Sequence, residues 1–173
     1  MTRRLSLLIS WGCTALLSAF LLIALYCLAN IDEFAEFTQK SIGLPIAWST
    51  VVSWQWFALW ITTFLYMAIG MAGLYFLRRP FAHFARGELF NLANSRNLQR
   101  FSILILVQAI AKPIHFALSS VILSANHGAG NKMLSISVGS NEVRMIAVAI
   151  VFWVVSNLLI EGCKLQSENQ QFV

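Results

Sequence analysis

Apolar residues are gathered in four long stretches of the chain, and polar residues are gathered in the segments between them. The stretches cover residues 5–29, 51–77, 101–123 and 145–160. A helix needs about 20 apolar residues to cross the roughly 30 Å of hydrocarbon in a bilayer, and the first three stretches reach that length. The fourth is shorter, so we expect its helix to continue to residue 163, where Lys164 can reach the headgroups. The pattern predicts an all-α integral membrane protein with four transmembrane helices in one domain, residues 1–173.

Composition agrees with this pattern, because 58% of the residues are hydrophobic and only 11% are charged. Soluble domains have about a quarter of their residues charged. The first apolar run is longer than the roughly 7 to 15 residues of a signal-peptide core. We therefore expect a retained first helix and keep a cleaved signal peptide as the alternative.

The positive residues predict the orientation of the helices. Lys and Arg are enriched in the loops of bacterial membrane proteins that stay in the cytoplasm. On one side of the four stretches lie eight such residues, Arg3, Arg4, Arg78, Arg79, Arg86, Arg96, Arg100 and Lys164; the other side has Lys40, Lys132 and Arg144. We expect a multi-pass protein of the bacterial cytoplasmic (inner) membrane with both termini in the cytoplasm.

This topology also accounts for the net charge of +5, which therefore does not indicate nucleic-acid binding. The three cysteines have no C-x-x-C spacing and no histidine cluster near them. We expect no metal, no other cofactor and no disulfide. Apart from the lipid bilayer, a second copy of the chain in a homo-oligomer is a possible partner, because small residues in the helices would allow two helices to approach closely.

A stripe of polar residues crosses the third apolar stretch. Gln108, Lys112, His115 and Ser119 follow at spacings of four, three and four residues, which places them on one face of a helix. A lysine near the bilayer centre costs about 2.5 to 3.5 kcal/mol on insertion scales, and such residues commonly mark functional sites. The stripe should therefore face the other helices.

Depth along the helices suggests which residues meet Lys112. Tyr66 and Gln108 are expected near it, with Asn157 closer to the cytoplasmic boundary, and no acidic residue is expected at its depth. Two interpretations remain open. Lys112 and His115 bind an anion or pass protons through a hydrated cavity, or Lys112 merely fixes helix packing.

The loops carry weaker signals. Pro80 is expected to end or kink the second helix, and Asn94 to cap the third. In residues 126–141, Leu134, Ile136 and Val138 alternate with serines. An irregular surface loop is the interpretation we favour, with a brief strand or a re-entrant segment as the alternatives.

Two motifs on the cytoplasmic side resemble a known family. They are Gly87-x-x-Phe90-x-x-x-Asn94-x-x-x-Leu98, which leads into the third helix, and Glu161-Gly162-x-x-Leu165-x-x-Glu168-Asn169 near the C-terminus. With the four-span layout, they resemble the bacterial membrane proteins grouped as domain of unknown function 2975 (DUF2975). The resemblance implies a four-helix membrane protein without an established activity, often encoded beside a helix-turn-helix regulator that would be a cytoplasmic partner. Pro113 fits the family's third helix, whereas Lys112 and His115 depart from its mostly apolar pattern.

Both motifs are expected at the cytoplasmic surface, so the leading hypothesis is a non-enzymatic regulatory or interaction module that presents this loop and tail. The alternative is a small transporter or channel subunit with a polar centre at Lys112 and His115. An enzyme is not expected, because no carboxylate pair, metal triad or activated nucleophile can be assembled from the sequence.

Overall fold

The computed structural model describes residues 2–86, 91–128 and 130–171, which form five α-helices and one 3-10 turn. In chain order these are α1 (Thr2–Ala29), α2 (Ile31–Ile42), η1 (Trp48–Thr50), α3 (Ser53–Phe84), α4 (Leu92–Ser124) and α5 (Ser140–Gln171). Four of them, α1, α3, α4 and α5, are long and apolar enough to cross a membrane. The all-helical class and the four long apolar helices are thus confirmed.

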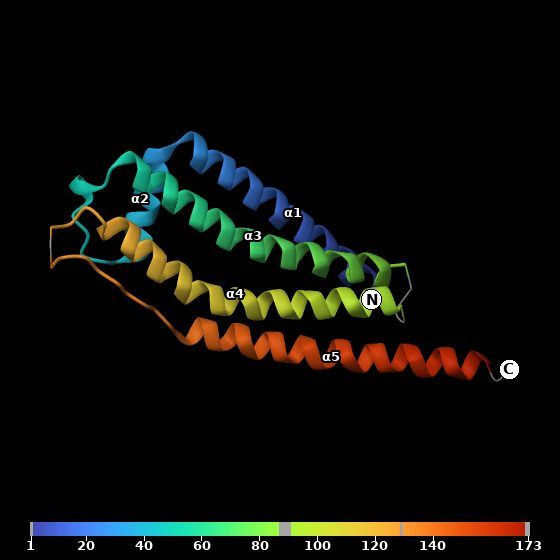
Figure 1. Ribbon diagram of the computed structural model, residues 1–173. Helices are drawn as coiled ribbons and strands as arrows, with labels where there is room; N and C mark the ends of the chain where they lie inside the picture. The colour runs from blue at the N-terminus through green and yellow to red at the C-terminus, as the bar shows by residue number, and fades with distance from the viewer. Residues whose placement is uncertain (1, 87–90, 129, 172–173) are drawn as a thin grey trace.

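The four long helices lie in a row. α1 packs on α3, α3 packs on α4, and α4 packs on α5, so α1 and α5 form the two edges (Figure 1). Both termini lie at one end of the row, here called the terminal end, and α2 lies at the opposite, far end (Figure 1). A row of helices has two open faces, which is why many large apolar side chains are exposed, as suits a protein that lipid surrounds.

The apolar-stretch pattern did not predict α2, although its sequence carries ordinary helix signals. Asp32 and Glu33 lie in the first turn and Lys40 in the last, where each charge complements the helix dipole. Gly43 ends the helix in a left-handed conformation at φ 60°. The buried Phe34 turns inward and packs with residues of α3 and α4 in a hydrophobic cluster at the far end.

The structure changes both expectations for the helix ends. Of the two alternatives for Pro80, the first does not hold, because α3 continues through Pro80 to Phe84. Asn91, not Asn94, caps α4: the backbone N–H of Ala93 donates to Asn91 Oδ1 at 2.8 Å. Asn94 instead lies inside the first turn and is buried.

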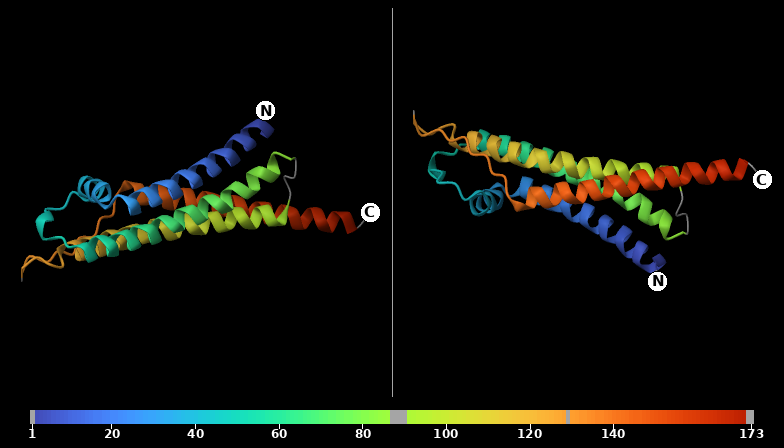
Figure 2. Two further views of the ribbon diagram at one scale, coloured as in Figure 1. Left: turned by 90° about the horizontal axis from the view of Figure 1, so that it is seen from above. Right: turned by 90° about the horizontal axis from the view of Figure 1, so that it is seen from below.

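The chain between α4 and α5 does not stay at the far end. Residues 132–139 form an extended segment that runs back along α4, so α5 begins well inside the row (Figures 1 and 2). The segment has no regular secondary structure and most of its residues are exposed, which agrees with the favoured expectation of an irregular surface loop and not with a strand; its return along α4 is what that expectation left out. The offset also makes the end of α5 project beyond the other helices at the terminal end (Figure 1).

Candidate functional site

The polar stripe of α4 faces α3, as expected. Thr63 Oγ1 and His115 Nε2 lie 3.1 Å apart, and the His115 ring stacks on Tyr66 with 5.1 Å between centroids. Tyr66 also lies near Gln108 and Lys112. We call one group of side chains the polar cluster. Its members are Tyr66, Gln108, Lys112, His115 and Glu142, the last of which is described next.

Lys112 has an acidic partner, and the expectation that none lies at its depth was wrong. Its Nζ forms an ion pair with Oε1 of Glu142, whose side chain is only 4% exposed. Lys112 follows Arg100 by twelve residues, which places it about 18 Å along the helix from that charge. Glu142 reaches this depth because it lies in the first turn of α5, which the extended segment carries back into the row.

The carboxylate of Glu142 also accepts a hydrogen bond from the backbone three residues before it. The N–H of Gly139 donates to Glu142 Oε2 at 2.6 Å, in the turn that begins α5. Glu142 therefore joins the end of the extended segment to α4 through Lys112. Two opposite charges that share a hydrogen bond tolerate a low-dielectric surrounding far better than either alone.

Two serines of α4 bind the backbone of the extended segment. The N–H of Met133 donates to Ser124 Oγ at 2.9 Å, and the N–H of Ser135 donates to Ser120 Oγ at 2.9 Å. The spacing matches because two extended residues cover about 6.6 Å and four helical residues about 6.0 Å. A non-helical backbone at membrane depth needs such partners, since lipid offers none.

The other two candidate intramembrane residues, Ser119 of the stripe and Asn157 of α5, lie apart from the polar cluster. Ser119 is buried but donates to the His115 carbonyl of its own helix at 2.8 Å. Asn157 lies nearer the terminal end, where its Oδ1 accepts a hydrogen bond from Gln99 Nε2 at 2.9 Å. The structure thus groups three of the five candidate intramembrane residues, Gln108, Lys112 and His115.

The sequence reasoning missed Gln55, which is fully buried at the far end. Its Nε2 donates to the carbonyl of Ile122 at 2.6 Å, and its Oε1 accepts from the N–H of Val52 at 2.8 Å and from Asn126 Nδ2 at 2.9 Å. Gln55 therefore satisfies backbone groups at the start of α3 and the end of α4. The sequence does contain a signal for this residue, because Gln55 is a lone amide among the tryptophans of the second apolar stretch.

The two terminal-end motifs meet along α4 and α5. Ser95 Oγ and Cys163 Sγ lie 4.0 Å apart, so the first turn of α4, which contains Asn94, lies beside the segment that follows Gly162. Glu161, Leu165 and Glu168 are exposed on α5. Gly87 and Phe90 lie outside the described residues, as does the side chain of Asn169.

The comparisons with known proteins give a family and no function. A family model described as "Protein of unknown function (DUF2975)" matches residues 45–173, about three quarters of the chain. The chain belongs to this family. No curated protein and no solved structure matches it. The DUF2975 match includes α3, α4, α5 and the whole polar cluster, whereas α1 and α2 precede it.

In this DUF2975 member, the polar cluster is a set of partnered side chains between three elements. Within residues 2–86, 91–128 and 130–171, no group of three or more His, Cys, Asp or Glu side chains could hold a metal ion. What the cluster can do is hold opposite charges and a stacked imidazole inside the span. It also fixes where α5 begins.

Proposed function

We propose that this DUF2975 member is a non-enzymatic, multi-pass protein of the bacterial cytoplasmic membrane, which presents the projecting end of α5 to a cytoplasmic protein. The observation that carries the proposal is the projection itself. Figures 1 and 2 show the last turns of α5 extending past every other helix. Beyond the contact of Cys163 with Ser95, the helix continues for eight residues, or about 12 Å.

The projecting part has the features of a helix that a partner binds. Its exposed residues, here called the tail surface, are Glu161, Lys164, Leu165, Gln166, Ser167 and Glu168. The Leu165 side chain is 61% exposed among charged and polar neighbours. An apolar anchor on a polar helix is the usual basis of helix-in-groove recognition.

Arginine placement supports a cytoplasmic location for the tail surface. Arg3 and Arg4 begin α1, Arg78 and Arg79 lie near the end of α3, and Arg96 lies near the start of α4, all at the terminal end. Short loops and helix ends rich in arginine remain in the cytoplasm of bacteria. A helix-turn-helix regulator is the partner that the family resemblance implies.

The test is affinity purification from mild detergent of the full chain and of two matched variants. Leu165→Arg removes the apolar anchor, and Ser167→Arg adds the same charge at another exposed position. We expect the helix-turn-helix regulator to copurify with the parent and with Ser167→Arg, and to be lost with Leu165→Arg and with a chain truncated after Gly162. Equal recovery of the same proteins with all four chains would contradict the proposal.

A second candidate function, a small transporter or channel subunit, is favoured by the ion pair of Lys112 and Glu142 inside the span. Ionisable pairs at this depth commonly line ion or proton pathways. Reconstituted into liposomes, such a protein would carry a proton or ion flux that Lys112→Met abolishes. Flux at the level of protein-free liposomes would rule this candidate out.

A further inference from the structure

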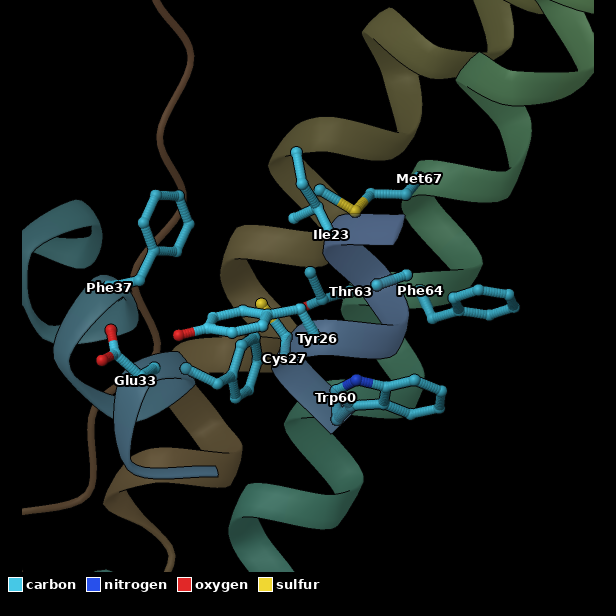
Figure 3. A pocket seen from close by; sticks show the side chains of 11 residues that line it. Ile23, Tyr26, Cys27, Glu33, Phe37, Trp60, Thr63, Phe64 and Met67 are labelled. Atoms are coloured by element: carbon cyan, nitrogen blue, oxygen red, sulfur yellow. The ribbon is translucent and has the colours of Figure 1, made fainter. Parts of the chain in front are cut away.

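A cavity of about 270 Å³ lies near the far end of the row, between α1, α2 and α3 (Figure 3). The last two turns of α1 form one wall, one face of α3 forms the opposite wall, and the first half of α2 crosses the entrance. Ile23 and Met67 close the deeper end, whereas Glu33 and Phe37 of α2 lie at the other (Figure 3). The polar cluster contributes no residue to this cavity.

Aromatic rings make up much of the lining. Tyr26, Phe34, Phe37, Trp60 and Phe64 each contribute a ring. Trp60 and Phe64 are stacked on each other at 5.2 Å with 9° between their planes, whereas the Tyr26 and Phe37 rings lie on the side of Glu33 (Figure 3). The faces of such rings carry partial negative charge, which attracts cations.

The cavity has one charged side chain, and that charge is negative. Of the lining residues, all of which the structure describes, only Glu33 is acidic and none is Lys or Arg. Within residues 2–86, 91–128 and 130–171, Glu33 forms no ion pair and feels the Lys40 charge only at longer range, whereas Glu36 on the same helix is paired directly with Lys40. The hydrogen bond from the Lys40 ammonium lowers the pKa of the Glu36 carboxyl, so that charge is already engaged.

We propose that this cavity binds a lipophilic cation, a small molecule with an apolar body and an ammonium head. The apolar body lies toward the end that Ile23 and Met67 close, and the head lies against the Tyr26 and Phe37 rings with Glu33 as its counter-ion. The chemistry excludes an anionic amphiphile, because the cavity offers a carboxylate and no cation. The Glu33 carboxylate also distinguishes the ligand from an ordinary acyl chain, which has no positive charge to pair with it.

The test uses octyltrimethylammonium and octyl sulfate, two amphiphiles with the same chain and opposite charge, titrated calorimetrically into the full protein in phosphatidylcholine nanodiscs. Empty nanodiscs give the partition background. We expect saturable binding of the cation above that background and at least tenfold weaker binding of the anion. Glu33→Gln should weaken cation binding about fivefold, the upper end of the range for an exposed ion pair.

Two further variants make the result specific. Glu36→Gln removes a carboxylate from the same helix outside the cavity lining, and it should change the affinity less than twofold. Met67→Trp fills the deeper end and should abolish saturable binding. Equal affinities for the two amphiphiles, an unchanged affinity in Glu33→Gln, or heats no larger than those of empty nanodiscs would each overturn the proposal, the last because lipid then occupies the cavity.

Discussion

Removal of the serine hydroxyls that bind the extended segment should destabilise the protein by an amount that the hydrogen bonds set. Ser120 and Ser124 are almost fully buried, and each accepts one backbone N–H of the segment at 2.9 Å. In soluble proteins, a buried donor left without a partner costs about 1 to 3 kcal/mol. Interhelical hydrogen bonds in membranes average only about 0.6 kcal/mol, with a maximum near 1.7. We therefore expect about 1 kcal/mol for either alanine variant and about 2 kcal/mol for both together.

Ser119 provides the matched control. It lies on the same helix and is equally buried, but its hydroxyl donates only to the carbonyl of His115 in its own helix. Ser119→Ala should therefore cost less than about 0.5 kcal/mol, because that carbonyl keeps its helical hydrogen bond.

Unfolding in mixed micelles of a mild detergent and dodecyl sulfate measures the free-energy differences. Hydrogen exchange then locates them: the amides of Met133 and Ser135 should lose protection in the alanine variants of Ser124 and Ser120, respectively. The reasoning is refuted if Ser119→Ala is as destabilising as the other two, or if both amides keep their protection when both hydroxyls are absent.

Two more predictions concern the polar cluster and its support. Lys112→Met and Glu142→Met should each lower the unfolding temperature, because a single change leaves one charge uncompensated. The double variant should therefore lose less stability than the sum of the two single variants. Additive losses in this double-mutant cycle would argue against the pair. Gly70→Ala should destabilise the protein, because a Cβ at this position would lie 2.7 Å from Gln108 Nε2. At Gly73 a Cβ would lie 3.7 Å from the Phe101 ring, so Gly73→Ala should be neutral or gain up to about 1 kcal/mol from its higher helix propensity. The same unfolding assay measures both variants.

The long helices could be predicted from the sequence because each is specified by its own composition. An apolar run of about 20 residues identifies a membrane helix without reference to any neighbour. The short helix α2 was missed because it has few apolar residues, yet Asp32, Glu33, Lys40 and Gly43 mark its two ends. A search for amphipathic helices between the spans would have found it.

The partner of Lys112 could not be predicted from the same reasoning. Counting residues along a helix gives depth only if each loop stays outside the membrane. Here the segment before α5 runs inward, so Glu142 lies opposite Lys112 although its place in the sequence suggests the outer boundary. The available signal was the alternation of serine with Leu134, Ile136 and Val138, together with two serines spaced by four residues on α4.

The path of residues 132–139 also determines a length at the opposite end of the molecule. Eight extended residues cover about 26 Å, whereas the same number in a helix would cover about 12 Å. Because α5 is a continuous helix from Ser140 to Gln171, a shift of its start by one extended residue translates its last turns along the helix axis by about 3.3 Å. The segment and the Lys112–Glu142 pair, which together place the start of α5, thus also set how far the tail surface projects beyond the other helices at the terminal end (Figure 1).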